Sequence, residues 1–205
     1  MNRIFVLSPA NCNGVRARYL LRKSSSSKLA KRLRGSGVPL SEVFSFVSSL
    51  YFRGKVTYAQ TFARPPTDCA GIFIITPTLG LVPHDKLIRM STLRLFSRGA
   101  IDVRNQLYCS SLRCSAKQLD SAIGSECEVV LLGSIATGKY LNLLSPIFAR
   151  RLRVPAEFIG RGDMSRGGLL LRCVNGNREL TYIDVPKKTQ GCDANLLRFS
   201  DSVRL

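Results

Sequence analysis

Short apolar runs separated by polar turns recur along the chain and predict alternating strands and helices. Residues 71 to 76 and 128 to 132 are nearly continuous apolar runs, as in strands covered on both faces of a parallel sheet. Residues 1 to 9 predict a first strand, and residues 153 to 159 predict another. We therefore expect an α/β fold of three layers, with a short, mainly parallel central sheet of about four or five strands.

Helical spacing of apolar residues follows the basic beginning of the chain. It predicts a helix that starts near Ser41, a candidate N-cap, and that Gly54 weakens before Pro65 and Pro66 end it. A second helix is predicted over residues 115 to 123.

The pattern near the end of the chain predicts a β-hairpin. Residues 169 to 174 and 178 to 185 flank an Asn-Gly-Asn sequence, which predicts a C-terminal β-hairpin. Residues 1 to 186 are expected to form a single α/β domain, and residues 187 to 205 an irregular tail.

Composition narrows the class of protein. A chain of 205 residues with 45% hydrophobic residues can bury one core, and no apolar run approaches the ~20 residues of a membrane helix. Its seven cysteines are scattered without a CxxC pair, and the chain has a single histidine, which argues against a disulfide framework and a zinc site. We expect a cytoplasmic protein without membrane association, cofactor or metal.

The excess of positive charge is the feature that bears most on the expected partner. The chain has 31 Lys and Arg against 13 Asp and Glu, and residues 1 to 60 hold 11 of the basic residues with Glu42 as the only acid. We expect residues 16 to 38 to be loose and to contact the phosphates of a nucleic acid. The alternative is a solvated basic loop that only aids solubility. The densest cations are Arg16, Arg18, Arg22, Lys23, Lys28, Lys31, Arg32 and Arg34.

The run Gly-Ser-Ile-Ala-Thr-Gly-Lys-Tyr over residues 133 to 140 resembles a phosphate-binding loop. Glycines let backbone N–H groups close around phosphate, and a lysine reaches its oxygens. Tyr140 stands where a Ser or Thr would hold Mg²⁺, so we expect no triphosphatase. The candidate anion or nucleotide ligands are Gly133, Ser134, Thr137 and Lys139, and the alternative is a plain turn.

Two other loops supply candidates by position. Loops at the carboxyl ends of strands line the ligand crevice in open α/β sheets, which selects Thr76, Thr78, His84 and Asp85 by position. His84 and Asp85 could form an acid–base pair, and the alternative is that His84 is an ordinary turn residue. Residues 160 to 168 read as a flexible glycine-rich loop. There Arg161 and Arg166 are candidates to grip an anion and Asp163 to act as a base, unless the loop is only a connection.

Three segments in this order resemble a known group. Residues 49 to 59, 74 to 85 and 129 to 133 are similar to uncharacterised bacterial α/β proteins, themselves distantly similar in fold to uracil-DNA glycosylases and the YaaA peroxide-stress proteins. The resemblance spans about residues 45 to 170 and implies the α/β fold. The chain departs from the group at Leu79, where a polar residue is usual, and it lacks the Gly-Gln-Asp-Pro-Tyr type of motif that activates water in a glycosylase.

Together these features predict a protein that engages nucleic acid or a nucleotide. The basic segment would contact phosphates, and the loops after Thr76, Leu132 and Ile159 would line one crevice. One alternative is a phosphate- or nucleotide-dependent enzyme with Lys139, Arg161 and Arg166 as its anion clamp and Asp163 or Asp85 as base. Another is a non-catalytic interaction module, since no Ser-His-Asp order, carboxylate pair or metal cluster selects a reaction.

Overall fold

The computed structural model describes residues 1–135 and 138–185, and within them six strands form one sheet in the order β4-β3-β1-β6-β7-β8. The four inner strands are parallel, and the outer strands β4 and β8 are antiparallel to their neighbours. The expected α/β fold with a mainly parallel sheet is confirmed. The bounds are β1 (Arg3–Leu7), β3 (Ile72–Thr76), β4 (Gly80–Pro83), β6 (Glu128–Leu132), β7 (Leu152–Pro155) and β8 (Tyr182–Asp184).

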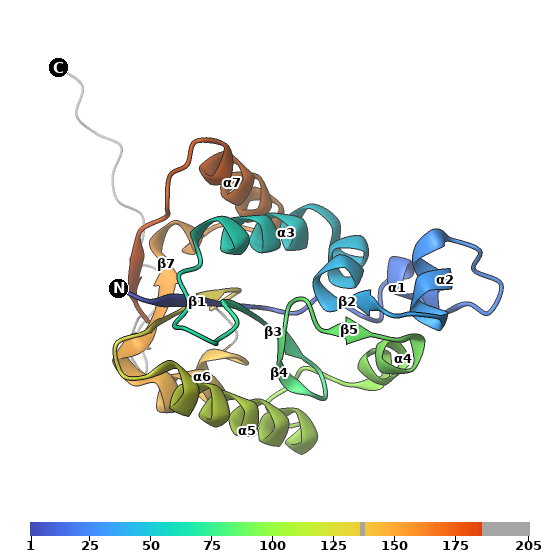
Figure 1. Cartoon of the computed structure of the whole chain (residues 1–205), viewed down its shortest axis with the longest axis horizontal. Coiled ribbons are helices and arrows are strands. Elements are labelled where there is room, and N and C mark those ends of the chain that lie inside the picture. Colours follow the sequence, from blue (N-terminus) through green and yellow to red (C-terminus); the bar gives the residue numbers. More distant parts are fainter. Residues whose placement is uncertain (136–137, 186–205) are drawn as a thin grey trace.

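Helices cover both faces of this sheet (Figure 1). α3 (Leu40–Phe62) and α7 (Asp163–Asn175) lie on one face, and α5 (Gln106–Ile123) and α6 (Leu141–Phe148) on the other. Alternation along β1 matches these two layers, because Phe5 and Leu7 join the core under α3 and α7 while Ile4 and Val6 join the core under α5 and α6. The apolar runs recognised in the sequence are therefore strands with two buried faces.

A small helical lobe extends from the carboxyl end of β1 (Figure 1). It consists of α1 (Val15–Leu21), α2 (Lys28–Arg34) and α4 (Met90–Arg98), with a short ribbon of β2 (Val38–Pro39) and β5 (Leu87–Ile88). Leu20, Leu33 and Phe96 bury its interior against the core on the α3 side. The expectation that residues 16 to 38 are loose is therefore wrong, because apolar residues between the cations give both helices a buried side.

Four consecutive serines, residues 24 to 27, lie between α1 and α2. Ser27 is the N-cap of α2, and its hydroxyl accepts a hydrogen bond from the Ala30 amide at 3.2 Å. None of the helices in the described part of the chain is both long enough and apolar enough to span a bilayer.

The predicted C-terminal β-hairpin is wrong. Residues 163 to 175 form α7 because Leu169, Leu170 and Cys173 fall on one helical side and pack under α3. The glycine of the Asn-Gly-Asn sequence caps that helix instead of turning a hairpin, and β8 pairs with β7. A short apolar run fits a strand or a buried helix equally well, so only the packing partner decides between them. The predicted tail lies outside the described residues.

Close contact between α3 and α7 depends on two glycines. A Cβ atom on Gly54 would lie 2.8 Å from the Gly167 carbonyl oxygen, and one on Gly167 would lie 2.9 Å from the Tyr51 Cα. At Ser49 the backbone has φ 53° and ψ −130°, so α3 is kinked there rather than at Gly54 as the sequence suggested. Such strained non-glycine backbone persists only where the surrounding packing enforces it. The second segment of α3 and the beginning of α7 are consequently in backbone contact.

Replacing Gly167 by alanine should lower the free energy of unfolding by about 2 kcal/mol, because the added methyl group overpacks the helix contact. Gly168→Ala is the matched control in the same helix, where a Cβ would meet only the mobile end of Arg172 at 3.3 Å. The control should gain up to about 1 kcal/mol from helix propensity. Urea unfolding of both variants measures the difference, and equal stabilities would show that the contact is not tight.

Candidate functional site

The most distinctive chemistry lies where β1 and β6 end side by side. β3 pairs with β1 on one side and β6 pairs with it on the other, so the order of the strands reverses at β1. Open α/β sheets bind ligands at such a point, beyond the carboxyl ends of the strands. Ser8 directly follows β1, and its amide donates to the Leu132 carbonyl at 3.1 Å. Gly133 directly follows β6, and a Cβ atom there would lie 2.8 Å from the Ser8 Cβ. Gly133 thus allows the two strand ends to approach.

Lys55 of α3 contacts the end of β1 from the face of the sheet that α3 covers. Its side chain is 1% exposed, and its ammonium donates to the Ser8 carbonyl at 2.6 Å and to the Ser8 Oγ at 2.8 Å. The Tyr51 and Phe52 rings lie 4.5 and 4.6 Å from the same nitrogen. Burial lowers the Lys55 pKa to about 7, an effect opposed by Asp163 and reinforced by Arg166. The site therefore contains an amine that changes its protonation near neutral pH.

A second buried cation comes from the first turn of α7. Arg166 is 7% exposed, donates to the Phe158 carbonyl at 2.8 Å and to Asp163 at 3.2 Å, and lies over the Phe158 ring. Asp163 is a weak counterion because its side chain is 67% exposed. The Arg166 Nε is buried and makes no hydrogen bond within the described residues.

Two tyrosines complete the cluster. The Tyr51 hydroxyl is buried and interacts with Arg166, Asp163 and Ser8, yet it makes no hydrogen bond of regular length and angle among the described residues. Burial raises its pKa to about 12. Tyr140 precedes α6 and interacts with Tyr51 and Asp163, and burial raises its pKa as well. We call Ser8, Tyr51, Lys55, Tyr140, Asp163 and Arg166 the switch-point cluster.

The cluster offers hydrogen-bond donors and an excess of positive charge. Two buried cations face one partly solvated carboxylate, an arrangement that favours an anionic ligand. Within residues 1–135 and 138–185, no three His, Cys, Asp or Glu side chains gather closely enough to hold a metal ion. The chemistry suited to the cluster is anion binding and proton exchange at Lys55.

Some predicted residues meet at this point and others do not. Gly133 lies in the site, Ser134 follows it half-buried, and Asp163 and Arg166 belong to the cluster. The expectation of one flexible loop over residues 160 to 168 is wrong, since Asp163 and Arg166 lie in α7. Thr137 lies outside the described residues.

The predicted anion clamp of Lys139, Arg161 and Arg166 does not assemble. The Lys139 ammonium lies 5.6 Å from the Tyr140 ring and interacts with Asp102 in the loop before α5. Arg161 is exposed and donates to Ser165 at 3.3 Å. Arg166 points inward, because it is held by a buried carbonyl.

The loop after β3 does not line the crevice in the predicted way. Thr76 is buried, accepts from the Leu79 amide and donates to the Gly80 carbonyl, so it closes the tight turn into β4. Thr78 is buried and packs against Gly99. The expected acid–base pair His84 and Asp85 is misplaced, because β4 runs antiparallel and carries both residues to the amino edge of the sheet.

Sequence reasoning missed Ser8, Tyr51 and Lys55. The usable signal was a lysine within an apolar helical pattern, since a charged residue there is either at the helix surface or buried with a specific partner. Only the packing of α3 on β1 shows which applies.

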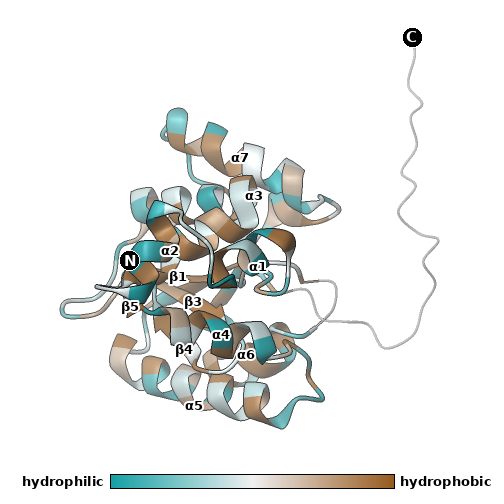
Figure 2. Ribbon diagram, turned by 90° about the vertical axis from the view of Figure 1, so that its right-hand side faces the viewer, coloured by the Kyte–Doolittle hydropathy of each residue, from teal (hydrophilic) through white to brown (hydrophobic). Residues whose placement is uncertain are grey.

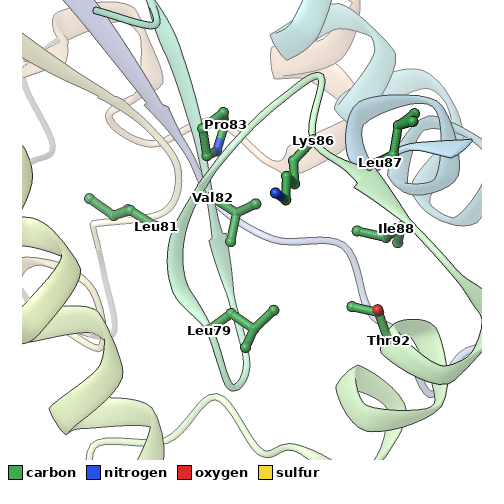
Figure 3. Close-up of a pocket in the computed structure, with 8 residues that line it drawn as sticks. All are labelled: Leu79, Leu81, Val82, Pro83, Lys86, Leu87, Ile88 and Thr92. Carbon is green, nitrogen blue, oxygen red and sulfur yellow. The ribbon is translucent and has the colours of Figure 1, made fainter. Parts of the chain in front are cut away.

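An open apolar pocket of about 360 Å³ lies between the β3–β4 hairpin and the ribbon strand β5 (Figure 3). Leu79, Leu81, Val82 and Ile88 supply much of its surface, and Lys86 is its only charged lining residue among those described. Its lining residues include no acid–base pair and no member of the switch-point cluster.

The helical lobe carries a different feature, a dense positive surface. Figure 2 views the molecule from the side of this lobe. Arg32 is half-buried and paired with Glu42, whereas the other seven predicted nucleic-acid contacts are exposed. α4 and the residues just before it add four exposed cations. Residues 86 to 101 contain no acid. These additional cations are Lys86, Arg89, Arg94 and Arg98.

Comparisons with known proteins found no match. No family model fits the chain, and neither a curated protein nor a solved structure is significantly similar to it. The resemblance to the uracil-DNA glycosylase and YaaA-like fold stays a prediction.

The protonation of Lys55 makes a testable contribution to stability. Its pKa is about 7 in the folded chain against an ordinary 10.5, so between these values the unfolded chain binds more protons and folding is favoured as pH rises. The stability of the wild type relative to Lys55→Met should therefore increase from pH 7 to pH 9 by about 1 kcal/mol per pH unit. Lys117→Met, which removes an exposed lysine of α5, is the control. Parallel trends for the two variants in urea unfolding would contradict the burial of a titrating Lys55.

Proposed function

We propose that the protein binds nucleic acid through its basic helical lobe. The observation that carries the proposal is the gathering of exposed cations from α1, α2 and α4, which are separated in sequence and packed together in the fold. Phosphates spaced along a nucleic acid match such a surface, and release of condensed counterions drives the binding.

The limited hydrogen bonding of the lobe cations supports this proposal. Arg16 and Arg18 donate to the carbonyls of Phe46 and Asn13, and Arg34 donates to that of Ser25, so each is oriented without losing its charge. Glu42 neutralises only Arg32. A surface of this kind attracts phosphate without requiring a particular base sequence.

The lobe also adjoins the switch-point cluster. The chain runs from Ser8 at the end of β1 to Val15 at the start of α1, so a strand of nucleic acid on the lobe would lie near the carboxyl edge of the sheet (Figure 1). This arrangement favours a binding protein whose surface leads toward a ligand site.

Replacing Arg22, Lys23, Lys28 and Lys31 by glutamine should weaken binding to DNA and RNA and reduce its salt dependence. These four side chains are exposed, and changing them leaves the oriented arginines intact. Each lost phosphate contact lowers the slope of log affinity against log salt by about 0.9 on duplex DNA. Fluorescence anisotropy on duplex and single-stranded oligonucleotides between about 50 and 200 mM salt measures the slope.

The matched control removes four exposed cations that lie outside the lobe, in α5, in α7 and in the turn after α6. These are Arg113, Lys117, Arg150 and Arg172. Its net charge equals that of the lobe variant, so general electrostatic attraction is kept constant. The proposal is rejected if the two folded variants show the same affinity and salt slope.

A further inference from the structure

We propose that the switch-point cluster is a binding site for a phosphate group, formed by Arg166, Tyr51 and Lys55 at the carboxyl ends of β1 and β6. This site is distinct from the lobe surface, and the inference does not depend on nucleic-acid binding there. The phosphate would belong to a free nucleotide or to the end of a nucleic-acid strand.

Unused donors are the first argument. The Tyr51 hydroxyl and the Arg166 Nε are buried, and neither makes a hydrogen bond of regular length and angle within the described residues, although the hydroxyl interacts with Arg166 and Ser8. A buried donor without a partner costs about 1–3 kcal/mol, so both are expected to have a partner in the functional state. The two groups interact electrostatically with each other, which places them around a common point.

Charge is the second argument. Lys55 and Arg166 come from different helices and interact electrostatically, with Asp163 as the carboxylate that interacts with both. In its charged form Lys55 gives two of its three N–H donors to Ser8. A dianion would compensate these cations and use the remaining donors, whereas a neutral ligand would leave the charge imbalance unchanged.

The position in the fold is the third argument. Gly133 lets the end of β6 touch Ser8, and the Gly54–Gly167 contact sets α7 against α3. The cationic groups are thereby fixed on packed helices rather than on loops. Because a guanidinium presents several N–H groups in a rigid plane, Arg166 suits a tetrahedral oxyanion.

Binding should be coupled to a proton. The charged and titratable groups facing Lys55 are Asp163 and Arg166 from α7 and Tyr51 from α3, while Tyr140 acts on Tyr51 and Asp163. A bound anion favours the charged amine, so it raises the Lys55 pKa above about 7 and takes up a proton. Affinity should therefore fall as pH rises from 6.5 to about 8.5.

Sulfate is the first probe, because its charge stays constant over this pH range while that of phosphate does not. Calorimetric titration of the full chain should show sulfate affinity falling with pH, and Lys55→Met should abolish this trend. Tyr51→Phe should weaken sulfate and phosphate binding about tenfold, the effect of one hydrogen bond to a charged group.

The same Tyr51→Phe variant separates a ligand-binding role from a structural one. Since its hydroxyl makes no hydrogen bond of regular length and angle among the described residues, removing it should leave the melting temperature unchanged or raise it. Tyr19→Phe, at an exposed tyrosine of α1, is the control and should retain sulfate affinity. Unchanged affinity in folded Tyr51→Phe, or no sulfate or phosphate binding by the wild type at about 10 mM, overturns the proposal.

Further arms distinguish the source of the phosphate. A nucleoside monophosphate that binds more tightly than inorganic phosphate identifies a nucleotide site, and a 5′-phosphorylated oligonucleotide that exceeds its 5′-hydroxyl form identifies a strand end. The lobe variant with four glutamines should keep sulfate binding, so failure of the lobe proposal and failure of this one give different results.

Discussion

The contact between α3 and α7 through Gly54 and Gly167 is the constraint on which the candidate site depends. Without Cβ atoms at these positions the two helix backbones touch, and the side chains beside them are directed toward the ends of β1 and β6. Tyr51 and Lys55 flank the contact on α3, and Arg166 flanks it on α7. The strained backbone at Ser49 is the adjustment that lets α3 bend into this geometry.

Cations at the two edges of the sheet have different partners. At the amino edge, Arg3 pairs with Glu128 and Glu179, while Arg153 also contacts Glu128. These ion pairs compensate one another and belong to the scaffold. At the carboxyl edge, Lys55 bonds to a carbonyl and a hydroxyl. Arg166 bonds to the Phe158 carbonyl, and the partly solvated Asp163 is its only carboxylate partner among the described residues. This excess of positive charge is the reason that we propose the ligand site at the carboxyl edge.

The basic lobe lies beyond the carboxyl end of β1. Its helices bury leucines and a phenylalanine in the core on the α3 side, so its cations are held in place without ion pairs to most of them. Mutual repulsion among such charges costs stability, and a polyanion relieves it. The proposed phosphate site and the proposed surface for nucleic acid are neighbours in the fold, and each proposal rests on its own contacts.

The sequence by itself determined the layered α/β fold, because continuous apolar runs such as residues 128 to 132 are buried on both faces wherever they pair. It also determined a dense run of positive charge, since eight cations among residues 16 to 34 have no acid between them, whereas the folding of that run into a helical lobe was not predicted. The strands β1, β3 and β6 were predictable for the same local reason.

Only the tertiary structure decided the identity of α7 and the membership of the site. Residues 169 to 174 became helical because α3 offers an apolar surface to Leu169 and Leu170, which no local pattern records. His84 was carried to the opposite edge by the antiparallel direction of β4. Lys55 joined Ser8 across a separation of 47 residues. Contacts between residues so far apart depend on how helices pack on the sheet, and local spacing does not encode that packing.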